Sequence, residues 1–299
     1  MSDVSMKNET QNSSKIEFTM RQRRFLHRIF FLYIPLFFFM AFALFPYLWL
    51  TISSFTSEEK LYDTDQSPWS FHSFSLEHYV DLLEDTEFLS WVWNSLFVGL
   101  ASTIFSVFIG ALAGYALARL RFKGSSYLGM GIIVTYLVPV SVLFLPLAYV
   151  FYNWGLVDTR LALILAYPTH LIPFCTWFML GYFKNIPADL EESAMIDGCT
   201  RIQAFYKIAL PLSLPGVLAA SIFAFTFSWN EFLYALTFIS TDELKTIPQG
   251  VHGQLVLGDA YYWGKLMAAT FLGSLPIAII YSFLSEFFVK GLTEGALKQ

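Results

Sequence analysis

Charged side chains are scarce in this chain of 299 residues, where Asp, Glu, Lys and Arg together make up 14%. A water-soluble domain carries about 25% of such residues, so a conventional solvated surface is excluded over most of the length. Cysteine is also rare, because Cys175 and Cys199 are the two in the sequence. Two cysteines are too few for a disulfide framework, and we expect both to be free thiols.

Sequence patterns for nucleotide and metal chemistry are missing as well. The phosphate-binding loop of ATPases (Gly, four residues, Gly, Lys, then Ser or Thr) does not occur, although such a loop is needed to cradle nucleotide phosphates. No cluster of His, Cys, Asp and Glu has the spacing of metal ligands. We therefore expect a non-catalytic chain that binds no cofactor itself. Nothing in the sequence indicates nucleic-acid binding.

Apolar residues, by contrast, make up 56% of the chain, and Phe alone occurs 32 times. About 20 consecutive apolar residues cross a bilayer, and lipid-facing helices are apolar on their outer surfaces. The sequence therefore predicts an all-α integral membrane protein. We expect Pro139 and Pro146 to kink the third of its six transmembrane helices, which are predicted at 29–52, 92–118, 128–152, 161–183, 214–238 and 266–289.

The first apolar run is not followed by a small-residue cleavage site and is too long for the core of a signal peptide. We expect it to be retained as a membrane span. The sequence is thus divided into a tail with a basic anchor at 1–28, a six-helix domain at 29–290 and a second tail at 291–299. Within the second span, Gly110 and Gly114 form a GxxxG pattern that predicts close helix packing.

Lys and Arg are distributed unevenly among the segments that connect the spans. Fourteen of the 18 fall in alternate segments, namely 1–28, 119–127, 184–213 and 290–299. The remaining four are Lys60, Arg160, Lys245 and Lys265. Because basic residues are retained on the cytoplasmic side, the pattern predicts that both termini are cytoplasmic.

The cytoplasmic loop 184–213 has the local chemistry of two short helices. Gly198 suits the left-handed residue that ends a helix, and Thr200 can cap the helix that follows. Acidic residues favour the N-terminal end of the first helix, and here they are Asp189, Glu191 and Glu192. Helical spacing places three apolar residues of the second helix on one stripe, namely Ile202, Phe205 and Ile208.

Two interpretations of this loop follow from the residues alone. The helices could lie on the membrane surface, or they could dock a soluble partner through the apolar stripe and the carboxylates. Helical spacing does not choose between them.

A longer pattern in the same loop resembles the EAA loop of ABC-importer permeases. It reads Glu192-Ser193-Ala194-x-x-Asp197-Gly198, then nine residues, then Ile208-x-Leu210-Pro211. The sequence departs from the family pattern at Ser193 and Cys199, where alanine is usual, and both replacements are small for small.

Other segments are similar to carbohydrate-importer permeases of the maltose-permease type. They are Trp229-Asn230-Glu231-Phe232, Trp263-Gly264 with Leu266-Met-Ala-Ala269, and Gly291-Leu-Thr with Gly295-Ala-Leu-Lys298. The likeness runs from about residue 25 to the end of the chain. It implies the type I ABC importer permease fold and a place in the bacterial cytoplasmic membrane.

The resemblance also implies partners for this chain. They are a second related permease that completes the pathway, two copies of an ABC ATPase, and an extracytoplasmic solute-binding protein. In the family, the EAA loop sits in a cleft of the ATPase, where Glu192 would pair with a cationic group and Ile202 and Phe205 would fill the cleft. The expected coupling residues are Glu192, Ser193, Ala194, Asp197, Gly198, Ile202, Phe205, Thr293 and Gly295.

The same resemblance implies a mono- or oligosaccharide as the solute. Sugars bind through hydrogen-bonding side chains and through stacking on aromatic rings, and the candidate pathway residues are Tyr136, Trp229, Asn230, Glu231 and Tyr234. Aromatic residues are also enriched at membrane interfaces for their own sake, so a packing role for each stays open. Two alternatives also remain: a permease for another solute such as a glycerophosphodiester or peptide, and an ion-coupled carrier that uses Glu231 and Glu286.

Overall fold

The computed structural model describes residue 25 and residues 27–63, 74–120, 122–258 and 260–296. Most of the predicted N-terminal tail and its basic anchor lie outside the described residues, and so do positions 297–299. The described part is almost entirely helical, and Val256–Leu257 (β1) and Ala260–Tyr261 (β2) form one short antiparallel hairpin within it.

Helices follow one another along most of the described chain. They are η1 (Ile29–Tyr33), α2 (Ile34–Ser54), α3 (Glu58–Leu61), α4 (Glu77–Asp85), α5 (Phe88–Arg119), α6 (Ser125–Tyr136), α7 (Val140–Asn153), α8 (Arg160–Ala166), α9 (Pro168–Asn185), α10 (Asp189–Ile196), α11 (Arg201–Ala204), η2 (Phe205–Ala209), α12 (Leu210–Leu212), α13 (Leu214–Asn230), α14 (Leu233–Phe238), η3 (Asp242–Leu244), α15 (Ile247–Leu255) and α16 (Trp263–Ala296).

Within the described residues, four continuous segments are long and apolar enough to cross a membrane. They are Ile29–Ser54, Phe88–Arg119, Arg160–Asn185 and Trp263–Phe283, and they correspond to the first, second, fourth and sixth predicted spans. Two bent helix pairs bring the number to six if each pair is one span. The bend of the first pair falls inside the third predicted span, whereas that of the second pair lies between Leu212 and Leu214, where the fifth predicted span begins.

The third predicted span bends sharply, as the prolines led us to expect. Helices α6 and α7 meet at 94°, and Pro139 stands at the break with extended backbone as the N-cap of α7. Proline lacks an amide hydrogen and disfavours helical conformation in the residue before it, so the kink at Pro139 is confirmed. Helix α7 continues through Pro146, so the second predicted kink does not break the helix.

The fifth predicted span, 214–238, is wrong at its C-terminal end. Helix α13 stops at Asn230, and the extended backbone of Glu231 separates it from α14. The Glu231 carboxylate accepts hydrogen bonds from the backbone amides of Tyr234 and Ala235 at 2.9 and 3.2 Å. These bonds satisfy amides that the first turn of a helix leaves without partners, so the side chain starts a new helix instead of continuing the old one.

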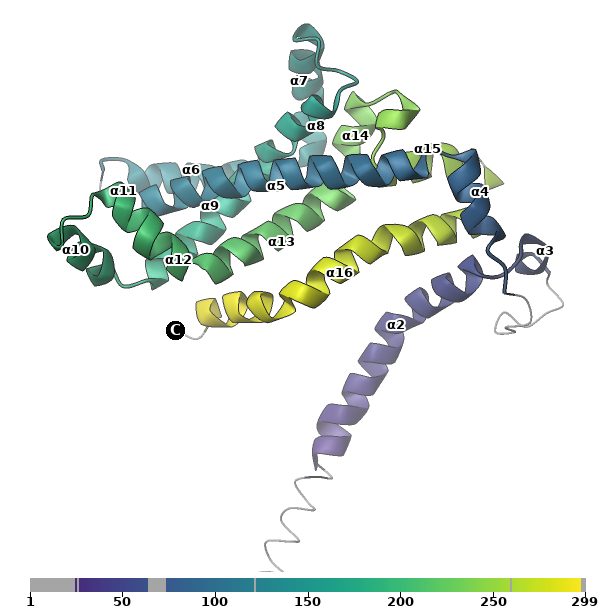
Figure 1. The fold of residues 1–299 in the computed structure, drawn as a ribbon, viewed down its shortest axis with the longest axis horizontal. Coiled ribbons are helices and arrows are strands. Elements are labelled where there is room, and N and C mark those ends of the chain that lie inside the picture. Colours follow the sequence, from purple (N-terminus) through teal and green to yellow (C-terminus); the bar gives the residue numbers. More distant parts are fainter. Residues whose placement is uncertain (1–24, 26, 64–73, 121, 259, 297–299) are drawn as a thin grey trace, which may run out of the picture.

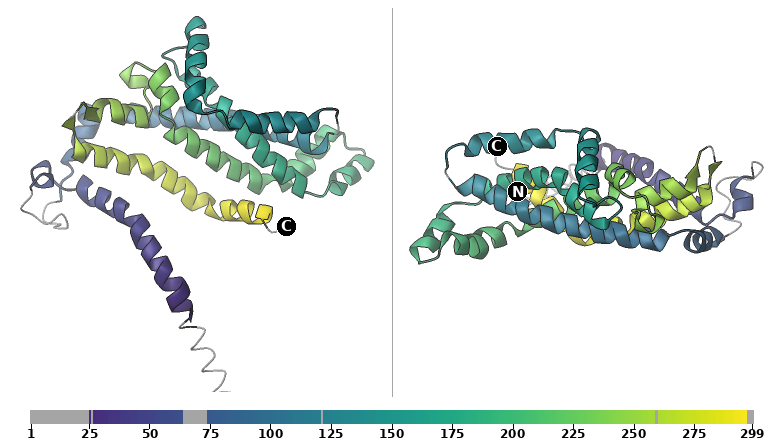
Figure 2. Two further views of the ribbon diagram at one scale, coloured as in Figure 1. Left: turned by 180° about the vertical axis from the view of Figure 1, so that it is seen from behind. Right: turned by 90° about the horizontal axis from the view of Figure 1, so that it is seen from above.

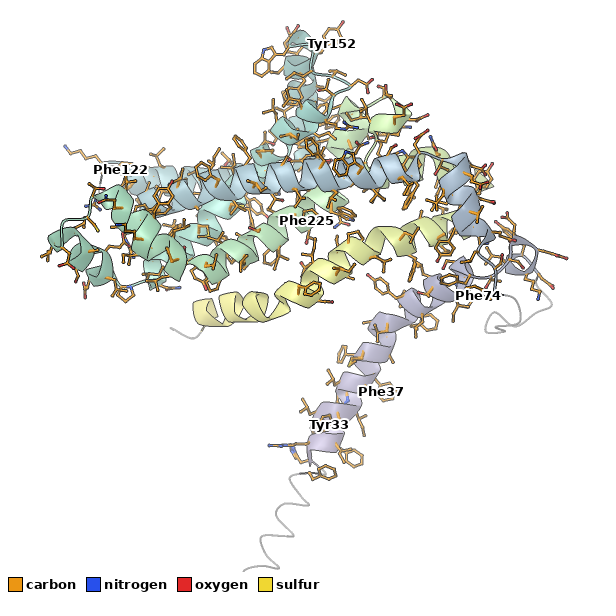
Figure 3. All side chains as sticks on the ribbon, in the orientation of Figure 1. Tyr33, Phe37, Phe74, Phe122, Tyr152 and Phe225 are labelled. Atoms are coloured by element: carbon orange, nitrogen blue, oxygen red, sulfur yellow. The ribbon has the colours of Figure 1, made fainter. Side chains whose placement is uncertain are left out.

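The bundle is centred on α5, which packs along most of α9 and also against α13 (Figure 1). Helices α10 to α12 lie at one end of these long helices, and α7 stands steeply away from them, as Figure 2 shows from two further sides. Helix α2 diverges from the bundle, and none of its most apolar stretch is buried within the chain. Tyr33 at the end of η1 and Phe37 of α2 are therefore exposed (Figure 3).

The GxxxG pattern of the second span does bring two helices together. A Cβ atom added at Gly110 would lie 2.5 Å from the Cβ of Cys175, and one added at Gly114 would lie 2.8 Å from the backbone nitrogen of Leu180. Both distances are too short for real atoms, so a side chain at either position would force α5 and α9 apart. The prediction of close packing is confirmed.

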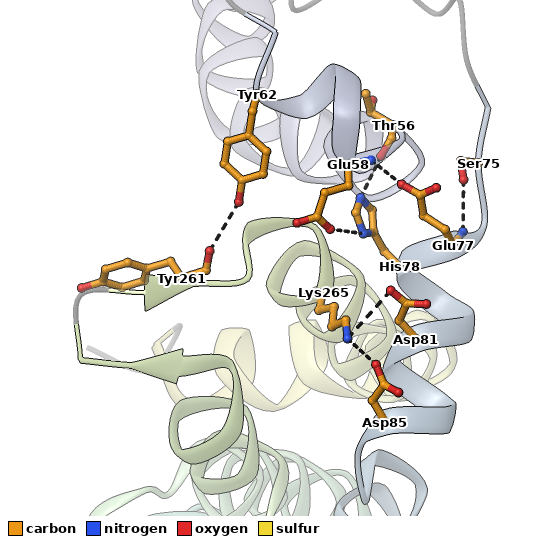
Figure 4. A network of polar contacts seen from close by, with 10 residues as sticks. All are labelled: Thr56, Glu58, Tyr62, Ser75, Glu77, His78, Asp81, Asp85, Tyr261 and Lys265. Carbon is orange, nitrogen blue, oxygen red and sulfur yellow. Dashed lines mark hydrogen bonds and ion pairs between the residues drawn. The ribbon is translucent and has the colours of Figure 1, made fainter.

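A polar network holds α4 against the start of α16 (Figure 4). The Lys265 ammonium lies 2.6 Å from the Asp85 carboxylate and 3.8 Å from that of Asp81. The buried imidazole of His78 contacts the carbonyl oxygen of Thr56 at 2.8 Å through Nε2. The segment between α2 and α5 is thus tied to α16.

Candidate functional site

The loop between α9 and α13 folds as its local sequence predicts. Gly198 has φ of +93° after the end of α10, a conformation that costs a residue with a side chain about 1–2 kcal/mol. The Thr200 hydroxyl accepts from the amide of Gln203 at 3.3 Å, and the Gln203 side chain accepts from the amide of Thr200 at 2.8 Å. This reciprocal capping box starts α11, so both turn predictions are confirmed.

The tip of this loop carries exposed apolar side chains beside exposed acids. Ile196 is 86% exposed and Ile202 is 71% exposed, while Glu192 and Asp197 are also exposed. Such a combination of apolar and acidic groups fits an apolar groove rimmed by cations. Ile196 was not among the predicted residues, although its place between Ala194 and Asp197 in the EAA-like pattern could have drawn attention to it.

Phe205 has to be removed from the predicted docking stripe. Its side chain is 5% exposed, and its ring centroid lies 4.6 Å from that of Tyr115 and 6.1 Å from that of Phe183. The π-helical turn η2 begins at Phe205 and buries it with Ala209 in the main core. Phe205 therefore holds the loop onto α5 and α9, while Ile202 stays at the surface.

Glu191 forms a second attachment that the sequence did not reveal. The residue is 4% exposed, and its carboxylate accepts from Arg119 Nε and from the Tyr115 hydroxyl, both at 2.7 Å. A second guanidinium nitrogen of Arg119 donates to the carbonyl oxygen of Ile186 at 2.7 Å. Removing one partner of such a buried pair costs about 3–5 kcal/mol, so the loop is fixed to the end of α5.

The predicted C-terminal tail is not a separate segment where the structure describes it. Helix α16 continues without a break through Thr293 and Gly295 to Ala296. Lys298 lies outside the described residues.

A cavity of about 700 Å³ opens between the transmembrane helices, within the range of 300–1,000 Å³ typical of ligand pockets. Its walls come from α6, α7, α9, α13, the break after α13, the start of α14, and α16. The lining residues are Tyr136, Val140, Ser141, His170, Leu171, Phe174, Phe223, Thr226, Phe227, Asn230, Glu231, Phe232, Leu233 and Tyr281.

Three of the five predicted pathway residues line this cavity, namely Tyr136, Asn230 and Glu231. Trp229 does not line the cavity. It precedes Asn230 in α13, and successive side chains of a helix point about 100° apart. Its indole nitrogen donates to the carbonyl oxygen of Gly273 at 3.1 Å, so it joins α13 to α16. Tyr234 is also a packing residue, because it is fully buried and its hydroxyl lies 3.2 Å from that of Thr169.

His170 is a cavity residue that the sequence reasoning missed. Its imidazole lies between two rings, with centroid distances of 4.7 Å to Tyr136 and 4.6 Å to Phe227. A lone histidine inside a predicted span was the available signal. Among the residues that the structure describes, no group of three His, Cys, Asp or Glu side chains is placed to hold a metal ion.

Known proteins share both the sequence and the fold of this chain. It is 39% identical over 257 residues to the sulfoquinovosyl glycerol transport system permease protein SmoH of Agrobacterium fabrum, covering 86% of this chain and 89% of that protein. It is 33% identical to the trehalose/maltose transport system permease protein MalG of Thermococcus litoralis, covering 86% and 92%.

A solved structure shares the helix arrangement. It belongs to a bacterial ABC transporter involved in the import of the acidic polysaccharide alginate, with a TM-score of 0.75 and 21% identity over 88% of this chain and 97% of that one. The type I importer permease fold implied by the sequence is thus confirmed. The family model described as "Binding-protein-dependent transport system inner membrane component" matches residues 106–294. This chain therefore belongs to the family of inner-membrane permease components of binding-protein-dependent ABC transporters.

Proposed function

We propose that this chain is the permease subunit of an ATP-driven importer for mono- or oligosaccharides and forms half of the translocation pathway. Several relatives that match over most of its length are named as permeases for sugars or sugar derivatives. The cavity supports the same conclusion, because aromatic rings line it together with hydroxyl, amide and imidazole groups. A sugar can pack its apolar ring face on the aromatic rings and pair its hydroxyl groups with the polar side chains.

The single observation that carries the coupling role is the exposed tip of the loop on a rigid base. Glu192 and Ile202 face outward, whereas Glu191 and Phe205 fix the loop to the helices behind it. A push from a partner at the tip would therefore be transmitted to α5 and α9. We assign ATPase contact to Glu192, Ser193, Ala194, Asp197, Gly198 and Ile202, with Ile196 added, and to the end of α16 at Thr293 and Gly295.

The proposal includes the partners that such a subunit requires. They are a second related permease, two copies of an ABC ATPase that bind ATP and Mg²⁺, and an extracytoplasmic solute-binding protein. The coupling loop and the C-terminal end of α16 lie toward the same end of the bundle (Figure 1). With the excess of Lys and Arg in the corresponding segments, this supports cytoplasmic positions for both termini.

The geometry of Glu231 argues against the ion-coupled carrier. Both of its carboxylate oxygens accept backbone amides of α14, which gives this acid a structural task. The side chain of Glu286 lies outside the described residues. A relay through these two acids therefore has no support in the described geometry.

The experiment is purification of the intact complex from its native membrane in mild detergent, followed by reconstitution in nanodiscs with the solute-binding protein. We expect a soluble ATPase to co-purify and a saccharide to stimulate ATP hydrolysis. Glycerophosphodiesters and short peptides serve as the comparison set. Absence of any co-purifying ATPase would contradict the importer assignment, and stimulation by a member of the comparison set alone would contradict the sugar assignment.

A further inference from the structure

We propose that the cavity contains a subsite for a neutral saccharide, built on the ring stack of Tyr136, His170 and Phe227. The proposal rests on the importer function above and adds the place and chemical class of recognition. The three rings come from three different helices, α6, α9 and α13. Their stacking therefore fixes the wall of the cavity where these helices meet.

The stack has the form of a sugar platform. His170 is held between the other two rings at 4.7 and 4.6 Å, tilted by 34° from Tyr136 and by 21° from Phe227. Two further rings of the lining, Phe174 and Phe223, pack edge to face at 5.5 Å. The apolar face of a pyranose ring packs on such surfaces, and the imidazole adds a hydrogen-bonding group within the platform.

Polar groups of α13 and α16 line the same cavity. The Asn230 amide nitrogen donates one hydrogen to the carbonyl oxygen of Thr226 at 2.7 Å, so its second amide hydrogen can donate to a ligand and its side-chain oxygen can accept from one. The Thr226 hydroxyl lies 3.3 Å from that of Tyr281. Amide and hydroxyl groups of this kind pair with sugar hydroxyls, whereas a lipid acyl chain has no groups that could form hydrogen bonds with them.

Charge in the cavity favours a neutral solute. Among the described residues that line it there is no Lys or Arg, and Glu231 contributes a carboxylate. On the wall that this chain contributes, an acidic sugar would find no permanently cationic partner, and an unpaired charge is costly to bury. A neutral saccharide loses only hydrogen bonds with water, which the polar groups can replace.

The experiment uses the reconstituted complex with its binding protein and a panel of radiolabelled saccharides. Trehalose, maltose and N,N′-diacetylchitobiose serve as neutral probes, and an alginate trisaccharide serves as the acidic probe. The neutral saccharide that the wild type imports fastest is then tested on two variants, H170A and S141W. The first removes the centre of the stack, and the second fills the cavity from an exposed lining position.

We expect both variants to assemble with the ATPase and to lose at least tenfold in import rate, with more ATP hydrolysed per sugar imported. The matched control is W177A, which removes an exposed ring of the same helix α9 that does not line the cavity and should import normally. Wild-type import by both H170A and S141W would overturn the subsite, and faster import of the acidic probe would overturn its neutral class. If the wild type imports no saccharide, the proposed function itself fails.

Discussion

The guanidinium of Arg119 and the carboxylate of Glu191 meet at 2.7 Å although 72 residues separate them in the sequence. Arg119 ends the long helix α5, and Glu191 lies in the first turn of the short helix α10. Their side chains are 10% and 5% exposed, so water screens the pair weakly. The contact fixes α10, and with it the exposed loop, to the C-terminal end of α5, the helix that packs along α9.

We predict that E191Q destabilises the purified complex by about 3 kcal/mol, because it leaves the Arg119 guanidinium buried without its counter-charge. Thermal unfolding followed by fluorescence measures the loss, and limited proteolysis should then cut between α9 and α11. The control is E192Q, which changes the neighbouring but exposed acid and should unfold like the wild type. Equal unfolding of E191Q and E192Q would contradict the structural role of the pair.

At Gly198, the effect of a substitution on ATPase binding should depend on whether the new residue tolerates left-handed backbone. G198V forces a β-branched residue to φ of +93°, which costs at least about 1–2 kcal/mol, whereas asparagine tolerates left-handed backbone. We expect G198V to lose ATPase co-purification and G198N to retain most of it. Space is not the cause, because a Cβ at this position would meet nothing within 4 Å. Equal retention by both variants would show that the left-handed turn is not required.

The approach of α5 to α9 gives a third prediction. G114V should prevent normal assembly, because even its Cβ would lie 2.8 Å from a backbone nitrogen of α9. The matched variant G131V adds the same side chain to α6, where a Cβ meets nothing within 4 Å, and should assemble normally. Size-exclusion chromatography of the solubilised complex separates the two outcomes. A normal elution profile for G114V would mean that the two helices can separate without loss of the fold.

The contact between Asp158 and the segment Ser240–Thr241 should be sensitive to acid. The Asp158 carboxylate accepts from the Thr241 hydroxyl at 2.6 Å and from the amides of Thr241 and Ser240 at 2.9 Å, and these bonds lower its pKa below the ordinary 3.8. Because the pKa is lower in the folded protein than in the unfolded chain, the ionised carboxylate stabilises the contact at any pH above the ordinary pKa. That stabilisation is lost as the pH falls through the pKa of the folded protein.

Hydrogen-exchange protection of the Ser240 and Thr241 amides measures this effect. We expect protection to be constant from neutral pH to about pH 4 and to fall below it. In D158N the side chain does not titrate, so the protection factor should not change in that range. A fall of the same size in D158N would assign the acid sensitivity to another group.

Features that depend on neighbouring residues were predictable from the sequence. The stop at Gly198 and the cap at Thr200 follow from backbone chemistry over a few positions, and the kink at Pro139 follows from a missing amide hydrogen. The contact of Gly110 and Gly114 with another helix also follows from their spacing on one face.

Features that depend on distant partners were not predictable in this way. Glu191 and Glu192 are adjacent and chemically identical, and which one turns inward is decided by Arg119 on another helix. The same is true of His170, whose ring acquires its place from Tyr136 and Phe227. The break after Asn230 was hidden by the apolar sequence on both sides of it, which reads as one continuous span.

The most direct test of the coupling role is site-specific photocrosslinking in the native membrane. Benzoylphenylalanine replaces Ile202 at the exposed tip of the loop. In the control it replaces the exposed Tyr152, which lies on α7, far from the loop (Figure 3). We predict a crosslinked product between this chain and an ATPase subunit from position 202 and none from position 152. Crosslinking of position 202 to lipid alone, in a complex that still imports its solute, would contradict the coupling role.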